Sequence, residues 1–124
     1  AAETTKPGGI IIAIVESPEI MDPPAFMGSF RFDSEADMER ALRENFTIPF
    51  FAAFNLFCLA HKYTIYMVTR RENFDLVRKT GQIPAETVEE AWAMAQAQCA
   101  EKGISKPTVN VLPHGGSVIP SLAK

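Results

Sequence analysis

The sequence contains little cysteine, and its cysteines form no metal-binding or disulfide pattern. The two are Cys58 and Cys99, each inside a helical apolar stretch. No CxxC pair is present, and neither His61 nor His114 stands at a ligand-like spacing from a cysteine. We therefore expect two buried free thiols rather than a zinc site. Free thiols are typical of the reducing cytoplasm, which is the location we expect.

Long apolar runs and an excess of positive charge are also missing. The longest apolar runs hold about seven residues, against the roughly 20 that a membrane-spanning helix needs. The formal net charge is -3, and no run of basic residues could neutralise a stretch of phosphates. Neither a membrane nor a nucleic acid is therefore an expected partner.

The residues that are present predict one α/β domain over residues 1–124. The chain has 47% apolar and 22% charged residues, which is the composition of a globular domain with its own core. Residues 10–15 are an unbroken apolar run, typical of a strand that is covered on both faces of a parallel sheet. Thr64–Val68 predicts a second strand, and residues 108–112 predict a third.

Helices are predicted between these strands from their start signals. Ser34 can cap one helix, and Thr87 can cap the last one with Glu90 three residues later. Pro49 suits the first turn of another, and a short helix is expected over residues 72–79. Strands that alternate with helices predict parallel crossovers. The expected fold is a small three-layer α/β sandwich with a mainly parallel sheet of three to four strands, the first of them in the middle.

Residues 50–61 form an unusually apolar helix in which only Asn55 is polar before His61. A surface helix should have a polar face, so something must cover this one. We consider two covers: a partner domain or subunit, or the long loop over residues 16–30. Within that loop, Pro23-Pro24 predicts no regular structure.

Chemistry in an open parallel sheet is expected at the carboxyl ends of its strands. The segments there are Glu16-Ser17, Thr69-Arg70-Arg71 and His114-Gly115-Gly116. They either surround a ligand crevice or are ordinary turns. No glycine-rich phosphate loop or nucleophile elbow is present, so we predict no catalytic residue and no metal ligand in this chain.

Four short segments, in order along the chain, carry a resemblance to a known family. They are Lys6-Pro7-Gly8-Gly9-Ile10-Ile11-Ile12, Thr47-Ile48-Pro49, Ile83-Pro84-Ala85 leading into Val88-Glu89-Glu90-Ala91, and Val109-Asn110-Val111-Leu112-Pro113-His114-Gly115-Gly116. Together they resemble the C-terminal domain of nickel-dependent lactate racemase homologues. The resemblance covers nearly the whole chain and rests on the order and spacing of the segments.

The resemblance implies a two-domain enzyme with its active site between the domains. The larger N-terminal domain would carry paired acid–base histidines and a lysine that holds a nickel-pincer nucleotide. The reaction would be racemisation or epimerisation of a small 2-hydroxyacid, by hydride removal to the cofactor and return. Nothing in this chain corresponds to those histidines or that lysine. We therefore expect an excised domain or separate subunit, inactive alone, whose partner is the cofactor-binding domain.

One position departs from the family pattern. In lactate racemases a Trp near the substrate follows the Thr-x-Pro pattern, and that position aligns with Ala52. A larger or more apolar 2-hydroxyacid than lactate is therefore expected. The candidate substrate-cleft residues are Ala52, Phe50, Phe51, His114 and Arg70. Two other functions remain open: a non-catalytic interaction domain or homodimer that uses residues 50–57, and a small-ligand module that uses the His114-Gly115-Gly116 edge.

Overall fold

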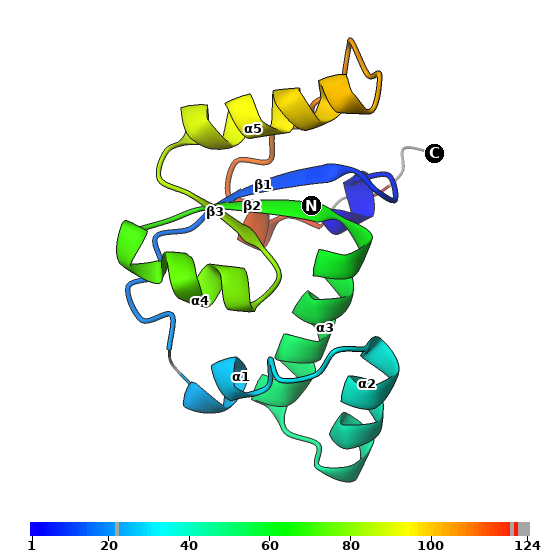
Figure 1. Ribbon diagram of the computed structural model, residues 1–124, viewed down its shortest axis with the longest axis vertical. Coiled ribbons are helices and arrows are strands. Elements are labelled where there is room, and N and C mark those ends of the chain that lie inside the picture. The colour runs from blue at the N-terminus through cyan, green and yellow to red at the C-terminus, as the bar shows by residue number, and fades with distance from the viewer. Residues whose placement is uncertain (22, 120, 122–124) are drawn as a thin grey trace.

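A parallel sheet of three strands forms the centre of the computed structural model, which describes residues 1–21, 23–119 and 121 (Figure 1). The strands are β1 (Ile10–Ile14), β2 (Thr64–Val68) and β3 (Ile83–Ala85). Both pairings are parallel, and Ile10 lies opposite Thr64. Helices lie on both faces of the sheet, so the predicted α/β sandwich with a parallel sheet is confirmed.

The strand order differs from the prediction in two ways. β2 lies between β1 and β3, so the prediction that the first strand is in the middle is wrong for the described strands. The third strand is β3, whereas residues 108–112 form no strand. β3 is only three residues long and contains Pro84, and a proline is tolerated there because β3 is an edge strand.

The described residues contain five α-helices, and the predicted caps at Ser34 and Thr87 start two of them. They are α1 (Pro24–Gly28), α2 (Glu35–Glu44), α3 (Ile48–Lys62), α4 (Phe74–Lys79) and α5 (Val88–Glu101). The hydroxyl oxygens of Ser34, Thr47 and Thr87 each accept a hydrogen bond from a backbone N–H three residues on. Such caps satisfy amide groups that have no partner inside the helix. Within the described ranges, none of the helices combines the length and apolar character needed to cross a membrane.

Two separate clusters of buried side chains hold these elements together. The first lies between α5 and the sheet, where Ala91 and Ala95 pack on Tyr66, Val68 and Ala85. Small alanines allow the helix to approach the strands closely. The second lies away from the sheet, between α3 and the α1–α2 segment. Its buried members are Met38, Leu42, Phe50 and Ala53.

The second cluster shows which residues cover α3. Phe26, Phe30 and Phe32, from the long segment after β1, pack against it. Phe32 stacks on Phe50 with a centroid distance of 5.9 Å. The chain's own loop therefore covers one side of α3. This loop contains helix α1, so the prediction that Pro23-Pro24 prevents regular structure is wrong: Pro24 occupies the first turn, where a missing N–H costs nothing.

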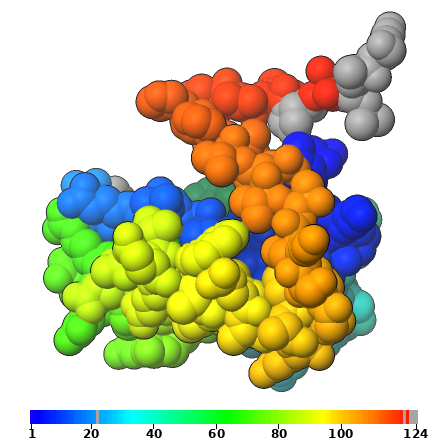
Figure 2. Space-filling model, turned by 90° about the horizontal axis from the view of Figure 1, so that it is seen from above, coloured from blue at the N-terminus to red at the C-terminus, as the bar shows by residue number. Residues whose placement is uncertain are grey.

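The chain after α5 leaves the body of the molecule. Gly103, with φ +73°, ends the helix in the left-handed conformation that glycine adopts without strain. Residues 104–111 are all exposed, and this segment, orange to red, projects from the body in Figure 2. Val118 and Ile119, further along this segment, form no strand.

Candidate functional site

The carboxyl ends of the three strands are joined to one another by arginine–carboxylate pairs. The Arg70 guanidinium, just after β2, donates to the Glu16 carboxylate, just after β1. The neighbouring Arg71 donates to Glu86, just after β3. Two of the three predicted crevice segments, Glu16-Ser17 and Thr69-Arg70-Arg71, are therefore brought together. These pairs are mostly solvent-exposed, so they contribute little to stability and are available to a ligand.

A buried asparagine supports this edge from beneath. The Asn73 amide nitrogen donates to the carbonyl oxygens of Ser17 (2.9 Å) and Glu16 (3.3 Å) and to the Thr69 hydroxyl (3.1 Å). The Thr69 hydroxyl itself donates to the Glu16 carbonyl at 2.9 Å. This network fixes Ser17 in the left-handed region, with φ 46°. Asn73 was not predicted as a functional residue, because an asparagine in the turn before a helix is common and therefore a weak signal.

The two arginines of the edge are paired with carboxylates of the chain itself. The hydrogen bond from Arg70 to Glu16 and the charge of that carboxylate raise the pKa of Arg70, and Glu86 raises the pKa of Arg71 in the same way. Both guanidiniums therefore stay cationic. Arg70 forms a charge-assisted pair with an internal carboxylate, so a carboxylate ligand would have to replace Glu16 there.

An apolar surface lies at the opposite end of the molecule, where α2 meets α3. It consists of Phe46, Ile48, Phe51 and Ala52, which we call the apolar tip. Ile48 is 77% exposed and Phe51 46% exposed. Phe46 and Phe51 lie against each other with a ring-centroid distance of 6.0 Å. The Thr47 cap fixes the first turn of α3, so these side chains are presented outward from a rigid helix end.

The structure separates the predicted substrate-cleft residues. Ala52 and Phe51 lie exposed on the apolar tip, whereas Phe50 is only 7% exposed and packs inward under Phe32. Arg70 lies at the carboxyl edge of the sheet. His114 lies on the exposed segment after α5, in a left-handed conformation with φ 56°. Phe51 and Ala52 are therefore brought together, whereas Arg70 lies apart from them.

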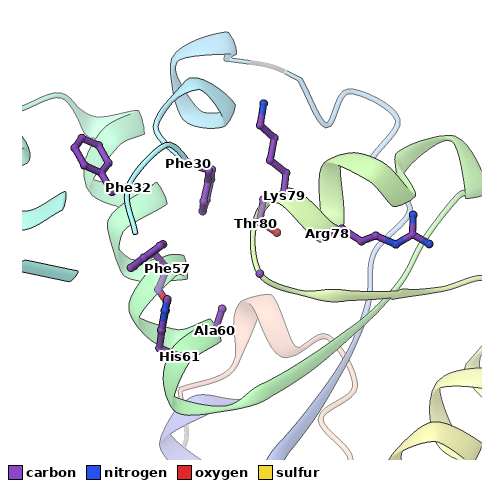
Figure 3. Close-up of a pocket in the computed structure, with 9 residues that line it drawn as sticks. Phe30, Phe32, Phe57, Ala60, His61, Arg78, Lys79 and Thr80 are labelled. Atoms are coloured by element: carbon purple, nitrogen blue, oxygen red, sulfur yellow. The ribbon is translucent and has the colours of Figure 1, made fainter. Parts of the chain in front are cut away.

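A cavity of about 260 Å³ opens between α3 and the end of α4 (Figure 3). Phe30, Phe57 and Ala60 point into it, while the charged ends of Arg78 and Lys79 point away. The His61 ring nitrogen Nδ1 is 2.8 Å from the Phe57 carbonyl one turn earlier, so the ring is held against its own helix. The walls are thus mainly apolar, and no charged group is directed at the space.

A larger cavity of about 480 Å³ lies under the loop after β1. Met67, Val77 and Leu56 form apolar walls, and Ser17 and Pro18 lie at its rim. It adjoins the Asn73 network through Ser17. Neither cavity combines a buried charge with a reactive group, so the two are apolar spaces, one beside α3 and the other beside the carboxyl edge of the sheet.

Metal-ligating residues are not clustered in the part of the chain that the structure describes: no three His, Cys, Asp or Glu side chains there could hold one ion. The described residues therefore do not fit a resident nickel site. No family model, curated protein or solved structure matches this chain.

Proposed function

We propose that this chain is the C-terminal, substrate-side domain of a nickel-pincer-dependent 2-hydroxyacid racemase or epimerase, located in the cytoplasm and inactive alone. Three of the four segments that carry the family resemblance belong to the sheet or to the start of a helix, whereas the fourth, residues 109–116, lies on the exposed segment after α5. Lys6-Pro7-Gly8-Gly9 is the turn into β1, Thr47-Ile48-Pro49 begins α3, and Ile83-Pro84-Ala85 is β3. The observation that carries the proposal furthest is the apolar tip.

Exposed apolar side chains of this size are typical of a surface that another body covers. Within the proposed enzyme, the tip would face the cofactor-binding domain across the substrate cleft. Closure would exclude water from the cleft, which protects a hydride-transfer step from side reactions. The pincer nucleotide, held by the other domain, supplies the hydride acceptor when bound. The residues of this chain would shape the cleft and restrict the size of the substrate.

Replacement of Ala52 by Trp in the complete protein tests this function. The larger side chain should fill space at the tip, so the ratio of kcat/KM for lactate to that for a larger 2-hydroxyacid should rise about tenfold or more. The measurement is interconversion of D and L enantiomers with the cofactor loaded. Ala93→Trp, on the exposed side of α5, is the matched control and should leave the ratio unchanged.

Two results would count against the proposal in different ways. An unchanged substrate ratio in Ala52→Trp would remove the tip from the substrate cleft. Failure of the loaded, unaltered protein to interconvert any 2-hydroxyacid would remove the reaction itself.

A second function has one observation in its favour. Ile48 and Phe51 could equally contact a second copy of the chain or an unrelated protein, since apolar exposure alone does not select the partner. This surface would lie on residues 50–57 of α3, of which Phe51 is exposed. Phe50 belongs to the second buried cluster, and Phe54 and Phe57 pack against it.

A further inference from the structure

The free edge of β1 is an unusual feature of the sheet. β1 reads Ile-Ile-Ile-Ala-Ile and has a strand partner on one side only, among the described residues. The Gly9 carbonyl and the Val15 amide both bond to β2. Backbone groups alternate in direction along a strand, so Ile10, Ile12 and Ile14 direct theirs to the free edge. An apolar edge without lysine or proline readily pairs with another strand.

The path of the chain identifies a candidate for that edge. The crossovers from β1 to β2 and from β2 to β3 pass through α3 and α4 on one face, while α5 lies on the other face (Figure 1). Parallel crossovers are right-handed. A helix that changes face must therefore lead the chain back in the opposite direction across the sheet. The chain that leaves β3 would therefore pass back over β2 and β1. The first position there without a strand is the free edge of β1.

The end of α5 places the chain at the correct end of β1. The Lys102 ammonium donates to the Gly8 carbonyl at 2.9 Å, two residues before β1 begins. Residues 103–107 then reach about 16 Å when extended, against about 5 Å between neighbouring strands. The following residues 108–112 are as long as β1 and contain the exposed, β-branched Val109 and Val111, the latter 80% exposed. They are unpaired in the structure and lie outside the body (Figure 2).

We propose that residues 108–112 dock on the free edge of β1 as a fourth parallel strand. The occupant is this chain's own segment. The proposal rests on the topology and not on the proposed racemase function. Docking would make β1 an internal strand and place the turn at His114 beside Ser17. The segments that follow β1 and the new strand would then lead in different directions. Such a place is a topological switch point, where open α/β sheets bind ligands.

Amide hydrogen exchange, followed by NMR on the 124-residue chain, tests the docking. The Ile11 and Ala13 amides face β2 and should be protected in every case, so they serve as internal references. The Ile12 and Ile14 amides face the free edge. If the segment docks, they should exchange about tenfold or more slowly than in the double variant Asn110→Pro/Val111→Pro, whose prolines cannot donate to a strand partner.

The matched control is Val118→Pro/Ile119→Pro, which should retain the protection. Equal exchange of Ile12 and Ile14 in the unaltered chain and in the Asn110→Pro/Val111→Pro variant would overturn the proposal. Protection that grows with protein concentration would also overturn it, because the occupant would then be a second copy. Protection of the Tyr66 and Met67 amides shows whether each variant is folded. If the variant unfolds, nuclear Overhauser contacts between β1 and residues 108–112 are measured in the unaltered chain instead. The absence of such contacts would count against docking.

Discussion

Among the single residues, Cys58 has a thiol whose chemistry is changed by its surroundings. It lies on α3, half-buried, close to Glu35 at the start of α2. Burial raises the pKa of the Cys58 thiol, and the Glu35 carboxylate raises it further by its charge and as a hydrogen-bond acceptor. The neutral thiol is therefore favoured over the reactive thiolate. This position suits a structural cysteine.

Replacement of Glu35 by Gln should make Cys58 more reactive. The pKa of the thiol should fall, so the thiolate fraction at pH 8 should rise and reaction with a disulfide reagent should accelerate several-fold. The rate would be measured in a Cys99→Ser background, so that only one thiol reacts. Glu44→Gln, at the other end of α2, is the control and should leave the rate unchanged. An equal rate in Glu35→Gln would show that Glu35 does not act on Cys58.

Among the elements, the contact of α5 with β2 contains a buried polar link. The Tyr66 hydroxyl donates to the Gln98 side-chain oxygen at 2.9 Å, and the Gln98 amide donates to the Thr64 hydroxyl at 2.8 Å. Burial raises the pKa of Tyr66, and nearby Glu101 and Cys99 add to the effect. The alanines of α5 provide close packing, while this link fixes how the helix is rotated and placed over the strand.

Tyr66→Phe tests this link through its pH dependence. At pH 7 the variant should lose about 1 kcal/mol of unfolding free energy, because Gln98 loses a partner. The pKa of Tyr66 is higher in the folded than in the unfolded chain. Its stabilising contribution is therefore present below the ordinary pKa of 10.0 and is lost as the pH rises through the folded value.

The difference between Tyr66→Phe and the unaltered chain should thus shrink between pH 7 and pH 11 in denaturant titrations. Gln98→Leu, which keeps the phenol, should retain the alkaline loss of stability. A difference that stays constant over this range would show that Tyr66 ionisation is not linked to folding.

The elements also show which parts of the fold the sequence can predict. β2 and the caps at Ser34 and Thr87 were predicted because their signals are local: hydrophobic pattern and side-chain-to-amide hydrogen bonds. β3 was missed because a three-residue strand around Pro84 exists only through its pairing with β2. The strand predicted at residues 108–112 has strand-forming residues but no partner in the structure, and propensity does not report partners.

The candidate site was predictable only in part. Two of the predicted turn segments meet because parallel strands place their carboxyl ends at one edge of the sheet. The side chains that hold them, Asn73 and Glu86, belong to segments without a recognisable motif. The inward position of Phe50 could not be predicted either, since it depends on Phe32 arriving from the long loop.

At the scale of the whole molecule, the two buried clusters divide the structure into a sheet layer and a helical lobe. The lobe consists of α1, α2 and the first part of α3, and the apolar tip is its outermost surface. The lobe buries its own aromatic residues, so the tip is not needed for folding. Its exposed side chains should therefore matter for association and not for stability.

Sedimentation of the isolated chain distinguishes the two candidate functions. As a racemase domain, the chain should remain a monomer up to high concentration, and Ile48→Glu should change the unfolding free energy by less than about 0.5 kcal/mol. A dimer that dissociates in Ile48→Glu/Phe51→Glu would favour the interaction domain. Val88→Glu is the control, because it places the same charge on exposed α5.

The connection between the lobe and the sheet has a mechanical consequence. α3 has 15 residues and is about 22 Å long, and Tyr63 is the one residue between its end and β2. If α3 tilted by about 5° about its junction with β2, the opposite end of the helix would move by about 2 Å. A displacement of Ile48 or Phe51 would therefore be transmitted by the rigid helix α3 to the middle strand β2, because no flexible loop lies between them.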